Sequence, residues 1–257
     1  MGRLRRTIAV AANTFRETIR ERVLYNLLFF AVLMTLSGLL LKQLSIRQDE
    51  KIIKDLGLAA MDVFGTVIAI IIGVGLVSKE IERRSLFPLL AKPLGRGELL
   101  LGKAAGLALT LLVNVVVMTL GLYLTLFLTG RPRELSLLKA VYGIYLGLLL
   151  ALALAMLFST VTSSAMASVC TVSLVVAGRF SDVIRNMSQV TSGVPTPFIE
   201  VMYWLLPNFR NFDFKNAVVY GLPVPPELLA LVTGYAVVYG GVVMLLALAA
   251  LRSKDFQ

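Results

Sequence analysis

The chain alternates between long uncharged windows and short charged segments. The uncharged windows are 23–41, 104–130, 140–178 and 228–251, and a fifth window over 56–78 is interrupted only by Asp62. A helix that crosses the hydrocarbon core of a bilayer needs roughly 20 apolar residues. The window over 140–178 is too long for one such helix, and the hydroxyl residues near its middle, at 159–164, suit a tight turn. The pattern therefore predicts an all-α, polytopic membrane protein with six transmembrane helices.

The remaining segments predict helices of other kinds. Residues 1–22 lack the apolar core of a signal peptide, and their apolar positions recur every three or four residues, which predicts an amphipathic helix in the membrane interface. Residues 185–226 contain six prolines and are not a clean span, so we expect short external re-entrant or amphipathic helices there. An ordered loop that merely connects two spans is the alternative. The six spans are expected in one permease domain, 23–257, at about 23–41, 56–78, 104–128, 138–159, 164–184 and 228–251.

Composition excludes a soluble globular protein. Hydrophobic residues make up 58% of the chain and charged residues only 16%, against roughly 25% charge in soluble domains. The net charge of +10 is explained by topology rather than by nucleic acid. Residues 1–22, 79–103 and 252–257 share one side and carry 14 Lys and Arg against 6 Asp and Glu, whereas the longer opposite side carries 11 against 7. The positive-inside rule therefore places both termini in the cytoplasm.

The chemistry available to the chain is narrow. Histidine is absent, which removes His-based triads and most zinc sites, and the single cysteine, Cys170, excludes an intrachain disulfide. An intramembrane aspartyl enzyme needs two buried carboxylates, and only Asp62 lies well inside a span. We therefore predict no catalytic residues, no metal site and no cofactor held by this chain.

Two isolated polar groups, a carboxylate and an amide, lie deep inside predicted spans. Asp62 is costly in lipid, so it should face a cavity, a partner or the interface. A water-exposed entry position, a place in the substrate path or gate, and a structural ion pair all remain open for it. Asn114 is assigned weakly to the substrate path, although an interhelical hydrogen bond is the preferred interpretation. Arg179 and Asp182, three residues apart, predict an ion pair at the outer end of the fifth span.

Small residues predict close helix packing at two places. Gly102-x-x-x-Gly106 and Gly143-x-x-x-Gly147 each put two glycines on one helix face. Both motifs are weak signals, and packing within the chain is sufficient to explain them.

The segment 79–103, between the second and third spans, carries a distinctive pattern. It reads Glu-x-Glu-Arg-x-Ser at 80–85, Leu-Ala-Lys-Pro-x-x-Arg-x-Glu-Leu at 90–99, and Gly-Lys at 102–103. This pattern resembles the loop of type-2 ABC-transporter permeases, and the six spans, the N-terminal helix and Arg252-x-x-Asp255-Phe256 also fit that family. The resemblance implies that the segment couples the permease to a separate ATPase. The coupling residues it implies are Glu80, Glu82, Arg83, Ser85, Leu90, Pro93, Arg96, Gly102 and Lys103.

The same segment contains a false nucleotide-binding signature. Residues 97–103 match G-x-x-x-x-G-K, but Ala104 stands where the Mg²⁺-binding hydroxyl should be, and leucines fill the middle. ATP and Mg²⁺ are therefore expected in a partner ATPase and not in this chain.

The resemblance implies the membrane subunit of an exporter in the plasma membrane of a prokaryote. About twelve spans around one path require a pair of six-span chains, most simply a homodimer, although a heterodimer with a similar permease remains open. A secondary transporter and a non-transporting membrane assembly factor are the alternative functions. The sequence does not identify the cargo, although the apolar spans weakly favour a hydrophobic one.

Overall fold

The computed structural model describes residues 3–19, 30, 49–82, 95–130, 134–181, 203 and 206–253. The regular elements in this part of the chain are helical, which confirms the all-α prediction for it. They are α1 (Arg3–Thr18), α3 (Asp49–Glu82), α5 (Arg96–Leu128), α6 (Leu137–Val161), α7 (Ser164–Arg179), the 3₁₀ helix η2 (Phe209–Phe212), α10 (Lys215–Val219) and α11 (Pro226–Ser253).

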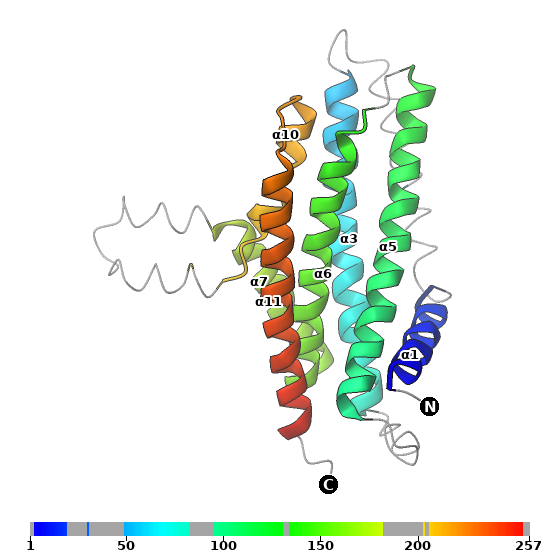
Figure 1. Cartoon of the computed structure of the whole chain (residues 1–257), viewed down its shortest axis with the longest axis vertical. Coiled ribbons are helices and arrows are strands. Elements are labelled where there is room, and N and C mark those ends of the chain that lie inside the picture. Colours follow the sequence, from blue (N-terminus) through cyan, green and yellow to red (C-terminus); the bar gives the residue numbers. More distant parts are fainter. Residues whose placement is uncertain are drawn as a thin grey trace, which may run out of the picture.

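The long helices run side by side along one axis (Figure 1). At one end, here called the terminal end, lie both chain termini, α1, the end of α3, the start of α5 and the turn between α6 and α7. The opposite, distal end holds the start of α3, the end of α5 and α10. Among the described residues, each end holds parts of the segments that the charge distribution assigned to one side of a membrane.

Four of the described helices are long and apolar enough to cross a membrane. They cover Glu50–Gly75, Gly97–Leu128, Leu137–Val161 and Pro226–Ser253, while the shorter α7 is also apolar. The first predicted span, 23–41, lies almost entirely outside the described residues. The number of six spans therefore stays a prediction.

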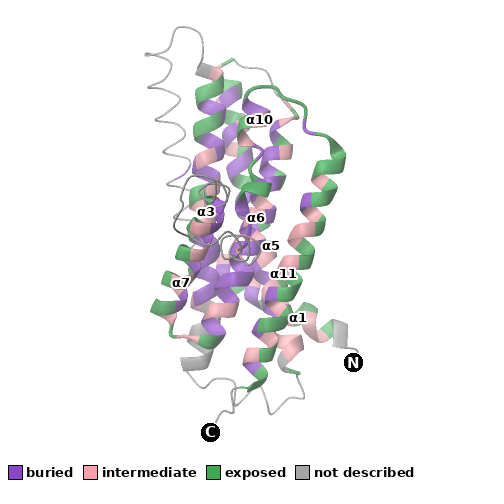
Figure 2. Ribbon diagram, turned by 90° about the vertical axis from the view of Figure 1, so that its left-hand side faces the viewer, coloured by how far each residue is buried: buried purple, intermediate pink, exposed green. Residues whose placement is uncertain are grey.

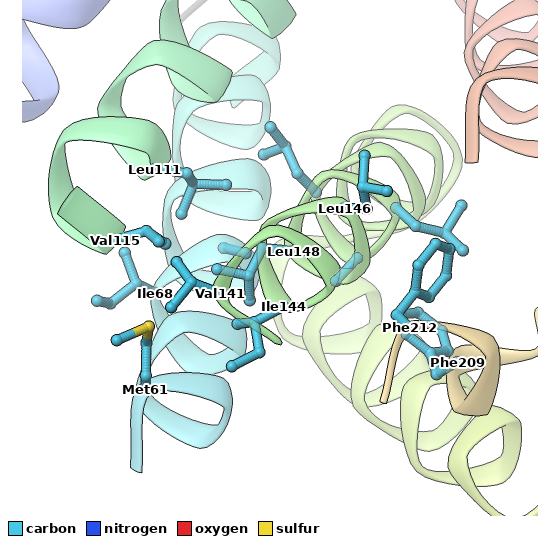
Figure 3. Packing of buried hydrophobic residues seen from close by; sticks show 14 of the residues in the cluster. Met61, Ile68, Leu111, Val115, Val141, Ile144, Leu146, Leu148, Phe209 and Phe212 are labelled. Carbon is cyan, nitrogen blue, oxygen red and sulfur yellow. The ribbon is translucent and has the colours of Figure 1, made fainter. Parts of the chain in front are cut away.

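Helix α6 forms the centre of the bundle and packs against α3, α5, α7 and α11 (Figure 2). Leu148 of α6 packs toward α3, where Gly65 leaves room for it, and buried residues of α3, α5 and α6 belong to one hydrophobic cluster (Figure 3). By contrast, α11 buries few of its side chains and exposes large apolar residues along most of its length. An apolar exposed face of this kind suits lipid or a second membrane subunit.

The hydroxyl residues at 159–164 form the turn between α6 and α7, as the sequence predicted. Helix α6 ends at Val161 and α7 begins at Ser164. The Thr162 hydroxyl donates to the Phe158 carbonyl at 2.9 Å, and the Ser159 hydroxyl reaches the Val74 carbonyl of α3 at 3.1 Å. These bonds satisfy carbonyl groups near a helix end, which is necessary in an apolar environment.

Helix α1 lies directly on α5, and the two glycines at 102 and 106 make this possible. A Cβ atom at Gly102 would lie 2.8 Å from the Val10 Cβ, and one at Gly106 would lie 2.6 Å from the Ala11 carbonyl oxygen. Any larger residue would separate the helices. The Gly102-x-x-x-Gly106 motif therefore serves packing within the chain, between α5 and α1.

The segment around η2 packs against the second glycine motif, Gly143-x-x-x-Gly147 of α6, and folds back along α6 and α7. Phe212 and Phe214 lie so close to Gly143 that no Cβ would fit there, and Pro207 and Phe209 approach Gly178 of α7 in the same way. Figure 3 shows Phe209 and Phe212 beside α6, on the side away from α5. The contact between Phe212 and Gly147 lies ten residues, or about 15 Å, from the start of α6. Two short helices, η2 and α10, lie within 185–226, and their external, re-entrant or amphipathic character stays a prediction; residues 182–202 lie outside the described part.

Candidate functional site

The most concentrated polar contact among the described residues is centred on Asp62 of α3. Arg179, at the end of α7, binds both carboxylate oxygens of Asp62: Nη1 donates to Oδ2 at 2.6 Å and Nη2 donates to Oδ1 at 2.7 Å. The Lys215 Nζ, at the start of α10, donates to Oδ2 at 2.7 Å. One carboxylate therefore joins three elements that are far apart in the sequence.

Thr66, one helical turn after Asp62, completes this arrangement. Its hydroxyl accepts from Arg179 Nη2 at 3.1 Å and donates to the Asp62 main-chain carbonyl at 2.7 Å. The guanidinium is thus oriented by three oxygen atoms, two from the carboxylate and one from the hydroxyl. Bidentate, charge-assisted pairs of this kind are among the strongest hydrogen bonds that side chains form.

Burial makes these partners necessary. The side chains of Asp62 and Lys215 retain only 13% and 15% of their exposure, while Arg179 retains 34%. Asp62 lies inside an apolar helix that is long enough to cross a membrane, and an unpaired carboxylate there is costly. Of the three interpretations left open, the structure supports an ion pair that also lines a cavity, rather than an isolated, water-exposed position.

The expected pairing of Arg179 with Asp182 stays a prediction. Asp182 lies outside the described residues, and both terminal nitrogens of Arg179 are directed at Asp62. Asp62 is 117 residues away in the sequence, on a different helix. Helical spacing alone gives no signal for such a contact.

Asn208 connects the start of η2 to the residue after α7 and to α11, and sequence reasoning missed this role. Asn208 caps the start of η2: its buried side-chain oxygen accepts a hydrogen bond from the Arg210 main-chain amide at 3.1 Å. The same oxygen accepts from the hydroxyl of Ser181, which follows α7, at 3.0 Å. The main-chain amide of Asn208 donates to the Tyr235 hydroxyl of α11 at 2.8 Å. A signal was available, because asparagine is a preferred residue at the start of a helical turn.

A cavity of about 530 Å³ opens beside the Asp62 cluster. Its walls come from α3, α6, α7 and the η2–α10 segment. One part of the lining is charged or polar and the other is apolar. The lining residues are Asp62, Arg179, Arg210, Asp213, Lys215 and Asn216, together with Ile144, Gly147, Phe209 and Phe212.

Asn114, the other residue assigned to the substrate path, does not line this cavity. Its side chain is buried on α5, 1% exposed, and both amide atoms lack a hydrogen-bond partner within the described structure. The preferred interhelical hydrogen bond is therefore not found for it. Nothing in the geometry assigns Asn114 a function.

The residues expected to couple to an ATPase divide into three groups. Glu80 and Glu82 lie in the last turns of α3, and Arg96 begins α5, all at the terminal end (Figure 1). Arg83, Ser85, Leu90 and Pro93 lie outside the described residues. Within this chain α1 packs against Gly102, and Lys103 is only 5% exposed, so the coupling role of these two residues stays a prediction.

The false nucleotide signature is explained by the same region. Residues 97–104 form the first turns of α5, so their amide groups belong to a helix rather than to a phosphate-binding loop. Lys103 is buried near α1, where the Glu17 carboxylate attracts it electrostatically.

Replacing the shared carboxylate should destabilise the protein. We expect Asp62→Asn to cost about 3 kcal/mol, because two largely buried cations lose their counter-charge. Thermal unfolding of the detergent-solubilised protein measures the loss. Asp213→Asn is the matched control, since Asp213 is 42% exposed and its removal should change little. Adding Arg179→Met to Asp62→Asn should recover part of the stability. Equal unfolding temperatures for Asp62→Asn, Asp213→Asn and the wild type would contradict the assignment.

Comparison with known proteins agrees with this architecture. No curated protein matches the chain. The sequence does match the family described as "ABC-2 family transporter protein" over residues 8–207, which covers most of the chain from within α1 to the residue before Asn208. The apolar helices and this match together show a multi-pass membrane protein. The chain belongs to the ABC-2 transporter family and is a membrane permease of an ABC transporter.

Proposed function

We propose that the chain forms the export path of an ABC transporter and is driven by a separate ATPase that docks at the terminal end. In this proposal the ATPase binds ATP and Mg²⁺, and this chain contributes no catalytic residue. The segment 79–103, together with α1, receives the movement of the ATPase. The segment resembles the coupling loop of the family by sequence, and its two described ends belong to the long helices α3 and α5.

One observation carries the proposal: the seating of α1 on the start of α5. The glycines at 102 and 106 bring the main chains of these helices into close contact. Gly102 lies within the segment 79–103, and Gly106 lies less than one helical turn beyond its end. A displacement of that segment would therefore move α1 and α5 together, and α5 spans the full length of the bundle (Figure 1).

The Asp62 cluster gives the distal half a part in the same mechanism. It attaches α7 and α10 to α3 through a single carboxylate. Separation of these elements, as the path opens outward, would break or rearrange this cluster. ATP can drive such a change only if the ATPase binds the two permease conformations with different affinity.

A second permease subunit completes the path in this proposal, most simply another copy of the chain. The exposed apolar face of α7 offers contact area, since Val169, Val172, Val176 and Phe180 are all between 46% and 60% exposed. Closed two-fold pairs are the commonest arrangement of identical subunits. We place the terminal end in the cytoplasm and the chain in the plasma membrane of a prokaryote, as the charge distribution predicts.

Charge reversal at the terminal end should separate the permease from its ATPase. We expect Glu82→Arg or Arg96→Glu to abolish co-purification of an ATPase while membrane insertion is unchanged, because the charges that would face the partner are inverted. Glu227→Arg, on the first turn of α11 at the distal end, is the matched control and should retain the ATPase. Undiminished co-purification of the ATPase with both Glu82→Arg and Arg96→Glu would contradict the coupling proposal. It would favour the secondary transporter or assembly factor instead.

Cysteine labelling tests the orientation. With Cys170→Ser as background, a membrane-impermeant thiol reagent should label Thr196→Cys in intact cells and should not label Ser85→Cys until the membrane is opened. The reason is that the positive-inside rule places residues 79–103 in the cytoplasm and 185–226 outside. The reverse labelling pattern would overturn the orientation.

A further inference from the structure

A second cavity, separate from the one beside Asp62, opens between α5 and α11 and is here called the α5–α11 groove. Its volume is about 390 Å³. Helix α6 forms its floor, and α5 and α11 form its two sides. The residues that line it are all apolar, in contrast to the Asp62 cavity, and they fall within 101–108, 146–156 and 236–244.

The groove lies mainly in the half of the bundle nearer the terminal end. Residues 101–108 belong to the first half of α5, which begins at that end, and most of 146–156 belongs to the second half of α6, which ends there. Ten residue steps along α6 correspond to about 15 Å. This length is half of the roughly 30 Å hydrocarbon core, which is the depth of a single leaflet.

The groove is open toward the outside of the bundle. Leu101 and Val237, which line its two sides, are 56% and 67% exposed. A Cβ atom added at Gly240 or Gly241 would meet no atom within 4 Å. The groove is therefore continuous with the exposed apolar surface of α11, and packing among the described residues does not fill it.

The described residues from the beginning of the chain pack on another face of α5. Helix α1 lies against Gly102 and Gly106, and a Cβ atom added at Gly121 would lie 3.6 Å from Cε1 of Phe30. The groove-lining residues of α5 recur at positions i, i+3, i+4 and i+7 and share a different face. Neither α1 nor Phe30 therefore occupies the groove.

The shape and chemistry of the groove restrict its occupant. Apolar cavities of this kind do not retain water, because water finds no polar partners in them. A volume of about 390 Å³ spread over about 15 Å gives a mean cross-section of about 26 Å². A helix with its side chains is about 10–12 Å across, so its cross-section is several times larger. A single extended hydrocarbon chain is slender enough to enter.

We propose that the α5–α11 groove holds one acyl chain of a phospholipid from the leaflet at the terminal end. The surrounding bilayer is as apolar as the groove, so the affinity comes from van der Waals contacts that an unfilled groove would lose. The site should therefore select the chain and not the head group. That the bound chain influences the movement of α5 rests on the proposed function, whereas the binding itself requires no ATPase.

Photochemical labelling of the purified full chain in nanodiscs tests the site. The probe is phosphatidylcholine with a diazirine in the middle of one acyl chain, and peptide mass spectrometry locates the labelled positions. We expect labelling of 101–108 and of the floor, 146–156, several-fold above that of Leu245 and Leu246, which are exposed on α11 outside the groove. Phosphatidylglycerol with the same reactive chain should give the same pattern.

Filling the groove should remove the label. Gly240→Leu places a side chain in the groove and should lower labelling of 146–156 about fivefold, because it takes the place of several methylene groups. Gly234→Leu is the matched control: a Cβ atom there also meets nothing within 4 Å, but the position lies outside the groove. Met244→Ala widens the groove and should raise the labelling, which a damaged protein would not do.

Three results would overturn the proposal. Labelling of 146–156 no greater than that of Leu245 and Leu246 would indicate bulk lipid only. Equal labelling of the Gly240→Leu and Gly234→Leu variants would show that the groove is not the site, and a groove that stays unlabelled would be covered by protein. The proposed function fails separately, because loss of ATPase co-purification with groove labelling retained would leave this site intact.

Discussion

A carboxylate inside an apolar helix needs nearby cations, and the distal half of this permease is arranged around that need. Asp62 draws the end of α7 and the start of α10 onto α3 by three hydrogen bonds of 2.6–2.7 Å. Since Lys215 follows η2 by only three residues, the same contact helps to hold the η2 segment against α6. The removal of one charge would therefore disturb an entire side of the bundle.

The two halves of the molecule are held together by different physical means. At the terminal end, glycines let α1 and α5 approach closely, and the Glu17 carboxylate of α1 attracts the buried Lys103 of α5. At the distal end, ionic contacts and the Asn208 hydrogen bonds position short segments that have little length for helix packing. Packed helices transmit displacement, whereas ionic contacts can break and re-form, which suits an input at one end and a gate at the other.

The sequence predicted those features that depend on local composition. Apolar windows located the long helices, the hydroxyl residues located the turn at 159–164, and the glycine motifs marked close approaches. The pairing of charged side chains that are far apart in the sequence could not be predicted. Asp62 meets Arg179 and Lys215 across 117 and 153 residues, whereas spacing suggested Asp182. The contact of Gly102 with α1 and the burial of Lys103 were missed for the same reason, because a motif records no tertiary neighbour.

The central claim is that Asp62 holds the η2–α10 segment onto α3. Hydrogen–deuterium exchange of the Asp62→Asn variant measures this most directly, with residues 206–219 as the reporter and α5 as the internal reference. The account predicts faster exchange in 206–219 and unchanged exchange in α5, because the segment loses its ionic attachment while the glycine-packed helices keep theirs. Equal protection of 206–219 in the variant and the wild type would contradict it.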